Sequence, residues 1–327
     1  EMFIQAGIEA GYIRNKDFNG ASQDGFGPFQ LTKIGGKRCS AATAFLKPIA
    51  SRQNLTILTR ASLRRVLFED KRAVGIEYQY KRQIVTARSS REIVISAGAV
   101  QSPQLLMLSG IGDPYELMVH GIDCIAPLPG VGKNLQDHLD IIVQYHCLDE
   151  SLTLNRFSKL RNMAAAFVQY LLFENGPAIE SPLEAGAFVR SRDDVEVPDL
   201  QLHFMPLFLH DHGRKKVAGA GLCMHVCQLR PSSRGEIGLA SSDPEAAPLI
   251  KANYLADPDD LTTMIRGVKI ARRVFNTEVF KSVLGKEHEF SRGLETDDEI
   301  ASFIRDYAET IYHPVGTCKM GQDRMAV

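Results

Sequence analysis

The sequence has no tryptophan, no apolar run long enough for a membrane-spanning helix, and almost no net charge. Tryptophan is the aromatic residue that best holds a quaternary ammonium group, so its absence removes the strongest kind of cage for such a cation. The apolar runs stay short of the roughly 20 residues that a spanning helix needs. With 38 basic and 39 acidic side chains, the charge balance gives no reason to expect nucleic acid as a partner.

Cysteine is also sparse, with six residues in 327 and none of the dense spacing of a secreted disulfide scaffold. We therefore expect reduced thiols and a cytoplasmic protein, with peripheral attachment to the inner membrane as an alternative. The chain begins with Glu1 rather than methionine and stops at Val327 just after an expected loop. We interpret it as a fragment or a processed piece. Its length is sufficient for two domains.

The segment 91–112, which reads REIVISAGAVQSPQLLMLSGIG, has the most specific local pattern. Residues 92–96 are nearly all apolar, which predicts a strand buried on both faces of a mainly parallel sheet. Ser102 is a good N-cap and Pro103 suits the first helical position, so we expect a helix to begin there.

Three residues with almost no side chain, Ala97, Gly98 and Ala99, separate this strand from this helix. In open α/β sheets, a flat or anionic ligand can approach the backbone closely at such a corner. Small residues also serve there simply to let a helix pack on a strand, and this is the more common use. Spacing alone leaves both interpretations open.

A second distinctive segment, YHPVGTCKMG, covers residues 312–321. Pro314 and Gly316 keep its backbone irregular, so we expect His313 to be presented from a loop at the end of a helix. A lone histidine in such a loop is more often a structural group. A histidine with a pKa near neutral can also serve as a general base when it reaches a substrate hydroxyl.

Both segments resemble signature sequences of the glucose–methanol–choline (GMC) oxidoreductases, a family of FAD enzymes that oxidise alcohols. The segment 91–112 is similar to the family's second signature, and HPVGTCKMG is similar to its active-site histidine segment. Further matching stretches are LPGVGKNLQDH at 128–138, EAGAFVR at 184–190 and RPSSRGEI at 230–237. The resemblance spans nearly the whole chain and is closest to the bacterial group that includes choline dehydrogenase and acceptor-dependent alcohol dehydrogenase.

The family's N-terminal G-x-G-x-x-G and its first signature are not in this chain. The resemblance therefore implies a Rossmann-like FAD-binding domain that is incomplete. The family's second active-site residue, a histidine or an asparagine, would lie beyond residue 327.

The resemblance also implies roles for individual residues. His313 would be the base or the hydrogen-bond partner of the alkoxide, and Tyr312 and Glu184 would line the substrate pocket. The residues that it assigns to FAD are Leu63, Ala97, Gly98, Ala99 and Asn134.

The implied reaction is oxidation of a primary alcohol to the aldehyde, with hydride transfer to the flavin N5. A base helps because an alcohol carbon releases hydride more readily as its hydroxyl loses a proton. The implied partners are a small-molecule alcohol and an electron acceptor, which would be a quinone, an electron-transfer protein or oxygen. With no tryptophan for a cation cage, we expect a neutral alcohol rather than choline.

Four alternatives remain open within and outside this reaction. Three of them keep the same fold: a choline dehydrogenase, an oxidase of the same family that uses oxygen, and a lyase that keeps its flavin for structure. From a different class, the chain would be a non-catalytic remnant, because it lacks the phosphate-binding glycines.

The expected fold is α/β, and α+β in part. Residues 1–34 would lead out of a missing N-terminal part, and 35–145 would form part of the FAD-binding domain with a β-meander. Residues 146–311 would form a substrate-binding domain whose mainly antiparallel sheet is backed by helices. Residues 312–327 would return to the FAD domain as the active-site loop.

Three other patterns have both a functional and a structural interpretation. Asp137 and His138 form an acid–base pair on spacing, although a structural hydrogen bond is the more common outcome. Cys223, His225 and Cys227 share one face of an expected strand, but their spacing is not that of a zinc site, and we predict no metal. The turn at 230–235 is expected to be a hairpin connection.

Overall fold

The computed structural model describes residues 1–179, 181–215 and 217–327, which form two compact units. Unit 1 comprises Glu1–Leu55, Leu139–Arg230 and Pro258–Ile311. The remaining segments, Thr56–His138, Pro231–Asp257 and Tyr312–Val327, make up unit 2. These bounds differ from the expected domain ranges, because the chain passes between the units five times and not only near residues 145 and 311.

Unit 1 is built on a seven-stranded sheet in which all neighbouring strands are antiparallel. Its main path runs β1 (Gly25–Pro28), β11 (Ala185–Val189), β12 (Leu200–Met205), β13 (Gly221–Gln228), β10 (Leu139–Cys147) and β16 (Leu284–Glu287), with β17 (Glu309–Thr310) also paired to β10. Every residue of β13 is buried, so this strand lies at the centre of the core.

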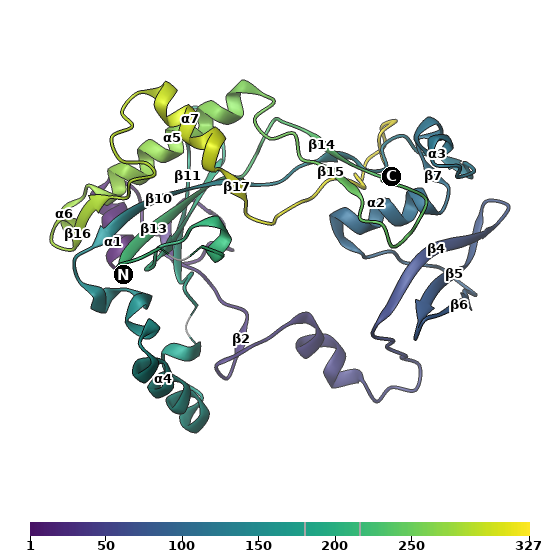
Figure 1. Ribbon diagram of the computed structural model, residues 1–327, viewed down its shortest axis with the longest axis horizontal. Coiled ribbons are helices and arrows are strands. Elements are labelled where there is room, and N and C mark those ends of the chain that lie inside the picture. Colours follow the sequence, from purple (N-terminus) through teal and green to yellow (C-terminus); the bar gives the residue numbers. More distant parts are fainter. Residues whose placement is uncertain (180, 216) are drawn as a thin grey trace. The chain divides into compact units, whose positions relative to one another are not determined.

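Helices back this sheet, as the sequence predicts. The helix α5 (Pro258–Phe275) packs on β13 and β10, and α7 (Asp297–Tyr307) packs on α5 (Figure 1). The approach is close, because a Cβ added at Gly267 would lie 2.4 Å from Cγ1 of Val226. Thr296 and Glu299 form a capping box at the start of α7, a feature that stabilises a helix by roughly 1 kcal/mol.

Unit 1 also contains several shorter elements. They are α1 (Met2–Glu9), β2 (Lys33–Ile34), β3 (Lys37–Arg38), α4 (Leu160–Phe173) and α6 (Glu278–Lys281), with short 3-10 or π turns between 42 and 49, 150 and 158, 177 and 179, and 211 and 213. Among them, the helix α4 is 14 residues long. Most of its large apolar side chains are exposed, and Ala166 is buried.

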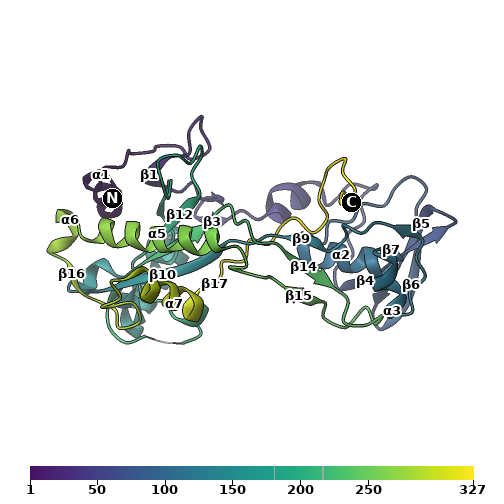
Figure 2. The same cartoon turned by 90° about the horizontal axis from the view of Figure 1, so that it is seen from above.

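Unit 2 contains the expected meander, β4 (Ala61–Glu69), β5 (Arg72–Tyr80) and β6 (Gln83–Arg88) (Figure 2). The helix α2 (Gly98–Leu108) packs against β4. The Oγ of Ser109, just beyond the helix, accepts the N–H of Val66 at 2.9 Å. The other elements of unit 2 are β7 (Ile111–Gly112), α3 (Pro114–Val119), β8 (Ala126–Pro127), β9 (Lys133–Leu135), β14 (Gly235–Gly238) and β15 (Leu249–Lys251).

Two local expectations about the segment 91–112 are wrong. Residues 92–96 form no regular element and pair with no strand of the described residues, and Val94 is 77% exposed rather than buried. The helix begins at Gly98 rather than at Ser102, which places Pro103 inside it. Ser102 instead accepts the N–H of Ala97 with its Oγ at 3.1 Å.

The turn at 230–235 is not a hairpin connection either. The strand β14 pairs with β9 and β15, whereas β13 belongs to the sheet of unit 1. The turn therefore carries the chain from one unit to the other. None of the helices in the described part of the chain has the length and apolar character needed to cross a membrane.

Candidate active site

The segment that carries His313 runs antiparallel to the LPGVGKNLQDH segment. Gln136 and Val315 exchange two backbone hydrogen bonds, of 2.9 and 2.8 Å. Further along, the N–H of Gly132 donates to the carbonyl of Thr317 at 2.9 Å. The two stretches with family-like sequence thus form one local structure within unit 2.

Asn134 strengthens this pairing with its side chain. It adopts a left-handed backbone conformation with φ of 64°, and its Nδ2 donates to the carbonyl of Gly316 at 3.0 Å. Its Oδ1 accepts the Nε–H of Arg234 at 3.1 Å. The amide of Asn134 therefore fixes the loop after His313, and a contact with the cofactor stays a prediction.

Asp137 anchors the other end of the loop. Its Oδ1 accepts the backbone N–H groups of His138 and His313, each at 2.9 Å, and its Oδ2 accepts the hydroxyl of Tyr254. The carboxylate is only 8% exposed, and hydrogen bonds to a buried charge are each worth about 1.5–3 kcal/mol. Of the two interpretations of Asp137, the contacts support the structural one: its carboxylate holds the backbone at His138 and His313.

The imidazole of His313 is exposed and lies against that of His138. Their Nδ1 atoms are 3.2 Å apart, and the ring centroids are 5.3 Å apart at 81°. Two nitrogens at this distance attract only if one of them carries a hydrogen and the other presents a lone pair. The contact therefore couples the two rings: one Nδ1 carries a hydrogen and the other presents its lone pair.

The small-residue corner forms the start of α2. Ala97 is the N-cap without a side-chain capping bond, and Gly98 has φ of 82° with open space where a Cβ would point. The first backbone N–H groups of the helix are therefore available to an anionic ligand. The Oγ1 of Thr317 donates to the carbonyl of Ala99, which joins this corner to the loop of His313.

A cavity of about 360 Å³ brings Leu63 and Ala97 together. It is lined by the start of β4, residues 94–97 and one side of α2. FAD fits these residues in two respects: a groove at Leu63 suits one end of an elongated dinucleotide, and the open corner at Gly98 suits a close backbone approach. Leu63, Ala97, Gly98 and Ala99 would hold it.

The two residues expected in the substrate pocket belong to different units. Tyr312 lies in unit 2, is 65% exposed and has φ of 65°. Glu184 lies in unit 1, where it is exposed and its carbonyl accepts the N–H of Phe29 at 2.9 Å. Their place in one pocket remains a prediction.

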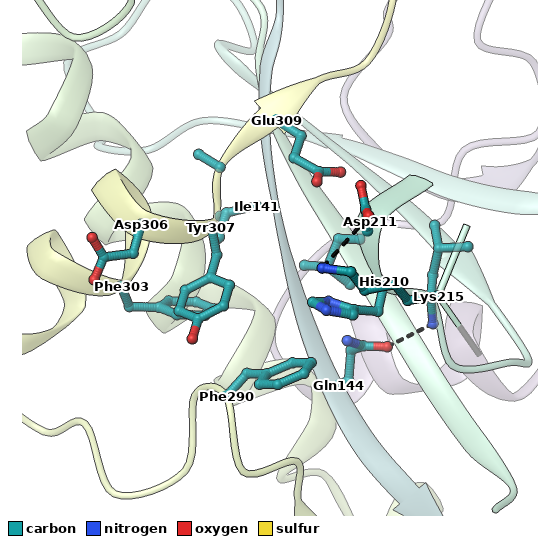
Figure 3. Close-up of a pocket in the computed structure, with 13 residues that line it drawn as sticks. Ile141, Gln144, His210, Asp211, Lys215, Phe290, Phe303, Asp306, Tyr307 and Glu309 are labelled. Atoms are coloured by element: carbon teal, nitrogen blue, oxygen red, sulfur yellow. Dashed lines mark hydrogen bonds and ion pairs between the residues drawn. The ribbon is translucent and has the colours of Figure 1, made fainter. Parts of the chain in front are cut away.

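Unit 1 has a cavity of its own, of about 340 Å³ (Figure 3). Aromatic side chains from the end of α7 and the loop after β16 line one side, and polar groups such as His210 and Asp211 line the other. The carboxylate of Glu309 at its rim pairs with His212 at 3.0 Å. The cavity therefore combines apolar and polar walls, as small-molecule sites do.

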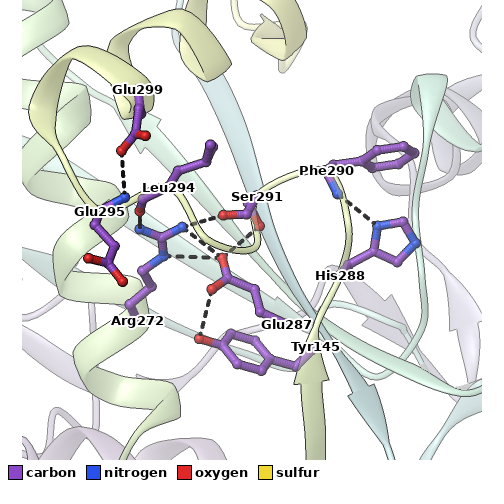
Figure 4. Close-up of polar contacts among 9 residues, drawn as sticks. All are labelled: Tyr145, Arg272, Glu287, His288, Phe290, Ser291, Leu294, Glu295 and Glu299. Atoms are coloured by element: carbon purple, nitrogen blue, oxygen red, sulfur yellow. Dashed lines mark hydrogen bonds and ion pairs between the residues drawn. The ribbon is translucent and has the colours of Figure 1, made fainter.

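A partly buried ion pair holds one wall of this cavity (Figure 4). The guanidinium of Arg272 contacts the carboxylate of Glu287 at 2.9 Å and donates to the carbonyl of Ser291 at 2.6 Å. Burial, and then the nearby charge of Glu287, raise the pKa of Tyr145, whose hydroxyl donates to the same carboxylate. These contacts fix the loop that carries Phe290.

The Cys–His cluster lies inside unit 1. His225 and Asp140 contact each other at 2.5 Å, and the Sγ of Cys227 lies 3.3 Å from Asp140 and 3.5 Å from Nδ1 of His203. Burial opposes a charge on His225, but the Asp140 carboxylate outweighs it and raises the pKa of His225 well above its ordinary value. Within the described residues, no three such side chains are arranged to hold a metal ion.

Comparisons with known proteins identify the family of the chain. Two family models, both described as GMC oxidoreductase, match residues 1–140 and 231–327. The chain is 46% identical to alcohol dehydrogenase [acceptor] of Pseudomonas putida, over 100% of this chain and 60% of that protein. It is 42% identical to the oxygen-dependent choline dehydrogenase of Brucella ovis, over 99% of this chain and 59% of that protein.

Solved structures show the same fold. Formate oxidase of Aspergillus oryzae aligns with a TM-score of 0.88 at 26% identity, over 97% of this chain and 60% of that one. Pyridoxine 4-oxidase from Mesorbium loti aligns with a TM-score of 0.86 at 26% identity, over 100% of this chain and 60% of that one. This chain thus spans about 60% of the length of the relatives that it matches. With both family models and the order of the two signature segments in agreement, the chain belongs to the GMC oxidoreductase family.

Proposed function

We propose that the protein is an FAD-dependent dehydrogenase that oxidises a primary alcohol to the aldehyde, with His313 as the base. The observation that carries this proposal is the way in which the backbone and the imidazole of His313 are held. Its imidazole is exposed, while its backbone is fixed by Asp137 in the same unit as the open corner of α2. A catalytic base needs this combination of an accessible ring and a rigid support.

We assign the lone pair that accepts the alcohol proton to Nε2 of His313. With the hydrogen on Nδ1 of His313, directed at Nδ1 of His138, the Nε2 atom of His313 keeps a lone pair for the substrate hydroxyl. The alcohol proton passes to this Nε2, and the hydride leaves the alcohol carbon. FAD, when bound, supplies the acceptor for that hydride at N5.

The electron acceptor is proposed to be a quinone, an electron-transfer protein or oxygen. Oxygen has support from the two oxidases among the similar structures, and a different acceptor from the alcohol dehydrogenase [acceptor] relative. We place the protein in the cytoplasm, because all six cysteines of this chain are free thiols. Peripheral contact with the inner membrane would accompany a quinone acceptor. Reoxidation of the reduced protein in air, followed by stopped-flow absorbance, separates oxygen from the other acceptors.

The decisive experiment is the absorption spectrum of the holoenzyme under nitrogen, before and after addition of primary alcohols. In the wild-type holoenzyme, the absorption bands of oxidised flavin are expected to disappear within the time of one turnover. His313→Ala should leave the flavin bound and slow its reduction by roughly 10²–10⁴-fold. Reduction at the wild-type rate in that variant would remove the role of base from His313, and a colourless protein would indicate a non-catalytic remnant.

A further inference from the structure

Helix α2 contains a proline in its interior, and this leaves one carbonyl without its helical partner. Pro103 is the sixth residue of α2, and in an α-helix the N–H of residue 103 would donate to the carbonyl of residue 99. Proline has no N–H. The carbonyl of Ala99 therefore has to find a donor outside the helix.

Thr317 supplies that donor. Its Oγ1 lies 2.5 Å from the carbonyl oxygen of Ala99, and since a carbonyl only accepts, the hydroxyl must donate. Thr317 is 1% exposed, so water does not compete for this bond. A hydroxyl 218 positions away in the sequence thus occupies the place that an N–H of residue 103 would have filled.

The same residue is part of the ladder that carries His313. The carbonyl of Thr317 accepts the N–H of Gly132, and the two bonds between Gln136 and Val315 follow along the same pair of segments. Asp137 then holds the N–H of His313 at the other end. Thr317 is therefore the point at which this ladder is joined to the first turn of α2.

We propose that Thr317 is a positioning residue, which uses the carbonyl left open by Pro103 to fix the segment of His313 against the Ala97–Ala99 corner. Pro103 leaves the Ala99 carbonyl without an N–H donor from the helix, and the Thr317 hydroxyl donates to that carbonyl instead. This inference rests on the proposed function, because the position of His313 relative to the corner matters for the reaction only if His313 is the base.

Four variants of the holoenzyme test the proposal. Thr317→Val keeps the side-chain shape but removes the hydroxyl, and Thr317→Ser keeps the hydroxyl. Pro103→Ala restores an N–H that can satisfy Ala99 from within the helix. The double variant Pro103→Ala/Thr317→Val thus has a satisfied carbonyl without the link to the loop.

Two measurements are made on each variant. The first is amide hydrogen exchange in peptides covering residues 97–103 and 312–318, which needs no turnover. The second is the limiting rate of flavin reduction at saturating alcohol under nitrogen.

Thr317→Val should exchange faster in 312–318 and reduce its flavin roughly 10- to 100-fold more slowly, because small misplacements of a catalytic group have effects of this size. Thr317→Ser should remain close to wild type in both measurements. The double variant should regain the exchange protection in 97–103 that is lost in Thr317→Val, yet keep the fast exchange in 312–318 and the slow reduction.

If the double variant recovered both the exchange protection in 312–318 and the wild-type rate of flavin reduction, the proposal would be overturned, because Thr317 would then only satisfy a carbonyl. Wild-type behaviour of Thr317→Val would overturn it as well. If Thr317→Val fails to fold, the double variant still decides. Failure of the proposed function is distinguishable, since it would appear as unchanged reduction in His313→Ala, whereas the exchange pattern of the Thr317 variants is independent of turnover.

Discussion

At the scale of single residues, the support of His313 matters as much as its imidazole. Asp137 accepts the backbone N–H of His313, so it determines where the imidazole is presented. The family resemblance of their neighbours singled out His313 and the corner Ala97–Ala99 as candidates, and their roles in the reaction stay predictions. Sequence reasoning left the role of Asp137 open between catalysis and structure, since the decisive contacts with His313 and Tyr254 join residues 176 and 117 positions away.

The first prediction concerns this carboxylate. Asp137→Asn replaces one acceptor oxygen with an NH₂ group that faces N–H donors, and it removes the buried charge. We expect a loss of about 1–3 kcal/mol in the free energy of unfolding and a fall of roughly 10-fold or more in the rate of flavin reduction. Urea unfolding and anaerobic stopped-flow measurements test the two effects.

Tyr254→Phe is the matched control, because it removes one hydrogen bond to Asp137 and leaves the bond to His313 intact. It should cost about 1 kcal/mol and change the rate little. Equal rates in wild type and Asp137→Asn would show that the backbone of His313 does not depend on this contact.

At the scale of elements, charged side chains connect the strands of unit 2. Lys133 on β9 contacts Glu236 on β14 at 2.8 Å, and Lys251 on β15 contacts the same carboxylate at 2.8 Å. Hydrogen bonds from Lys133 and Lys251 lower the pKa of Glu236 to about 2. The strand that carries Asn134 is therefore held in its sheet by a charge network as well as by backbone bonds.

The second prediction follows from the sign of this shift. A lowered pKa means that the Glu236 contribution is present above the ordinary value of 4.5 and is lost as the pH falls toward about 2. Glu236→Gln should cost roughly 1 kcal/mol at neutral pH after solvent screening. It should also flatten the acid dependence of unfolding between these two values. The exposed Glu196→Gln serves as the control, and an unchanged acid profile in Glu236→Gln would contradict the prediction.

The third prediction concerns the link between β10 and β13. His225 and Asp140 form a buried contact across these two strands. Asp140→Asn should destabilise unit 1 by about 3–5 kcal/mol, because it leaves His225 buried without its carboxylate.

The double variant Asp140→Asn/His225→Gln should lose less than the sum of the two single variants, since the pair acts as a unit. A raised His225 pKa also means that its contribution is present below the ordinary value of 6.5 and declines as the pH rises through the folded-state pKa. Unfolding in urea at several pH values measures both effects. Additive losses would show that the two side chains do not interact.

At the scale of the whole molecule, the sequence predicted the antiparallel sheet, the meander and the backing helices. The structure contains each of them. The division into units was not predictable in the same way. The strand β14 follows β13 in sequence but pairs with β9, and nothing in its own residues indicates a partner about 100 positions earlier. The strand expected at 92–96 failed for a related reason, because an apolar run becomes a strand only when another strand pairs with it.

The fourth prediction concerns substrate choice by the whole protein. A neutral primary alcohol of medium chain length should reduce the flavin faster than choline, because the chain has no tryptophan for a cation cage. The ratio of the second-order rate constants for the two substrates measures the preference. A higher value for choline would assign the protein to the activity of its Brucella relative.

The three-piece construction of unit 2 has a consequence for biosynthesis. Ribosomes deliver Thr56–His138 first, Pro231–Asp257 much later and Tyr312–Val327 last, while domains fold as units during synthesis. The partner of the Ala99 carbonyl therefore emerges only after all of unit 1 has been translated. In a nascent chain that has not yet reached Thr317, the Ala99 carbonyl lacks that hydroxyl as its donor, so the link between the α2 corner and the His313 loop forms only at a late stage of synthesis.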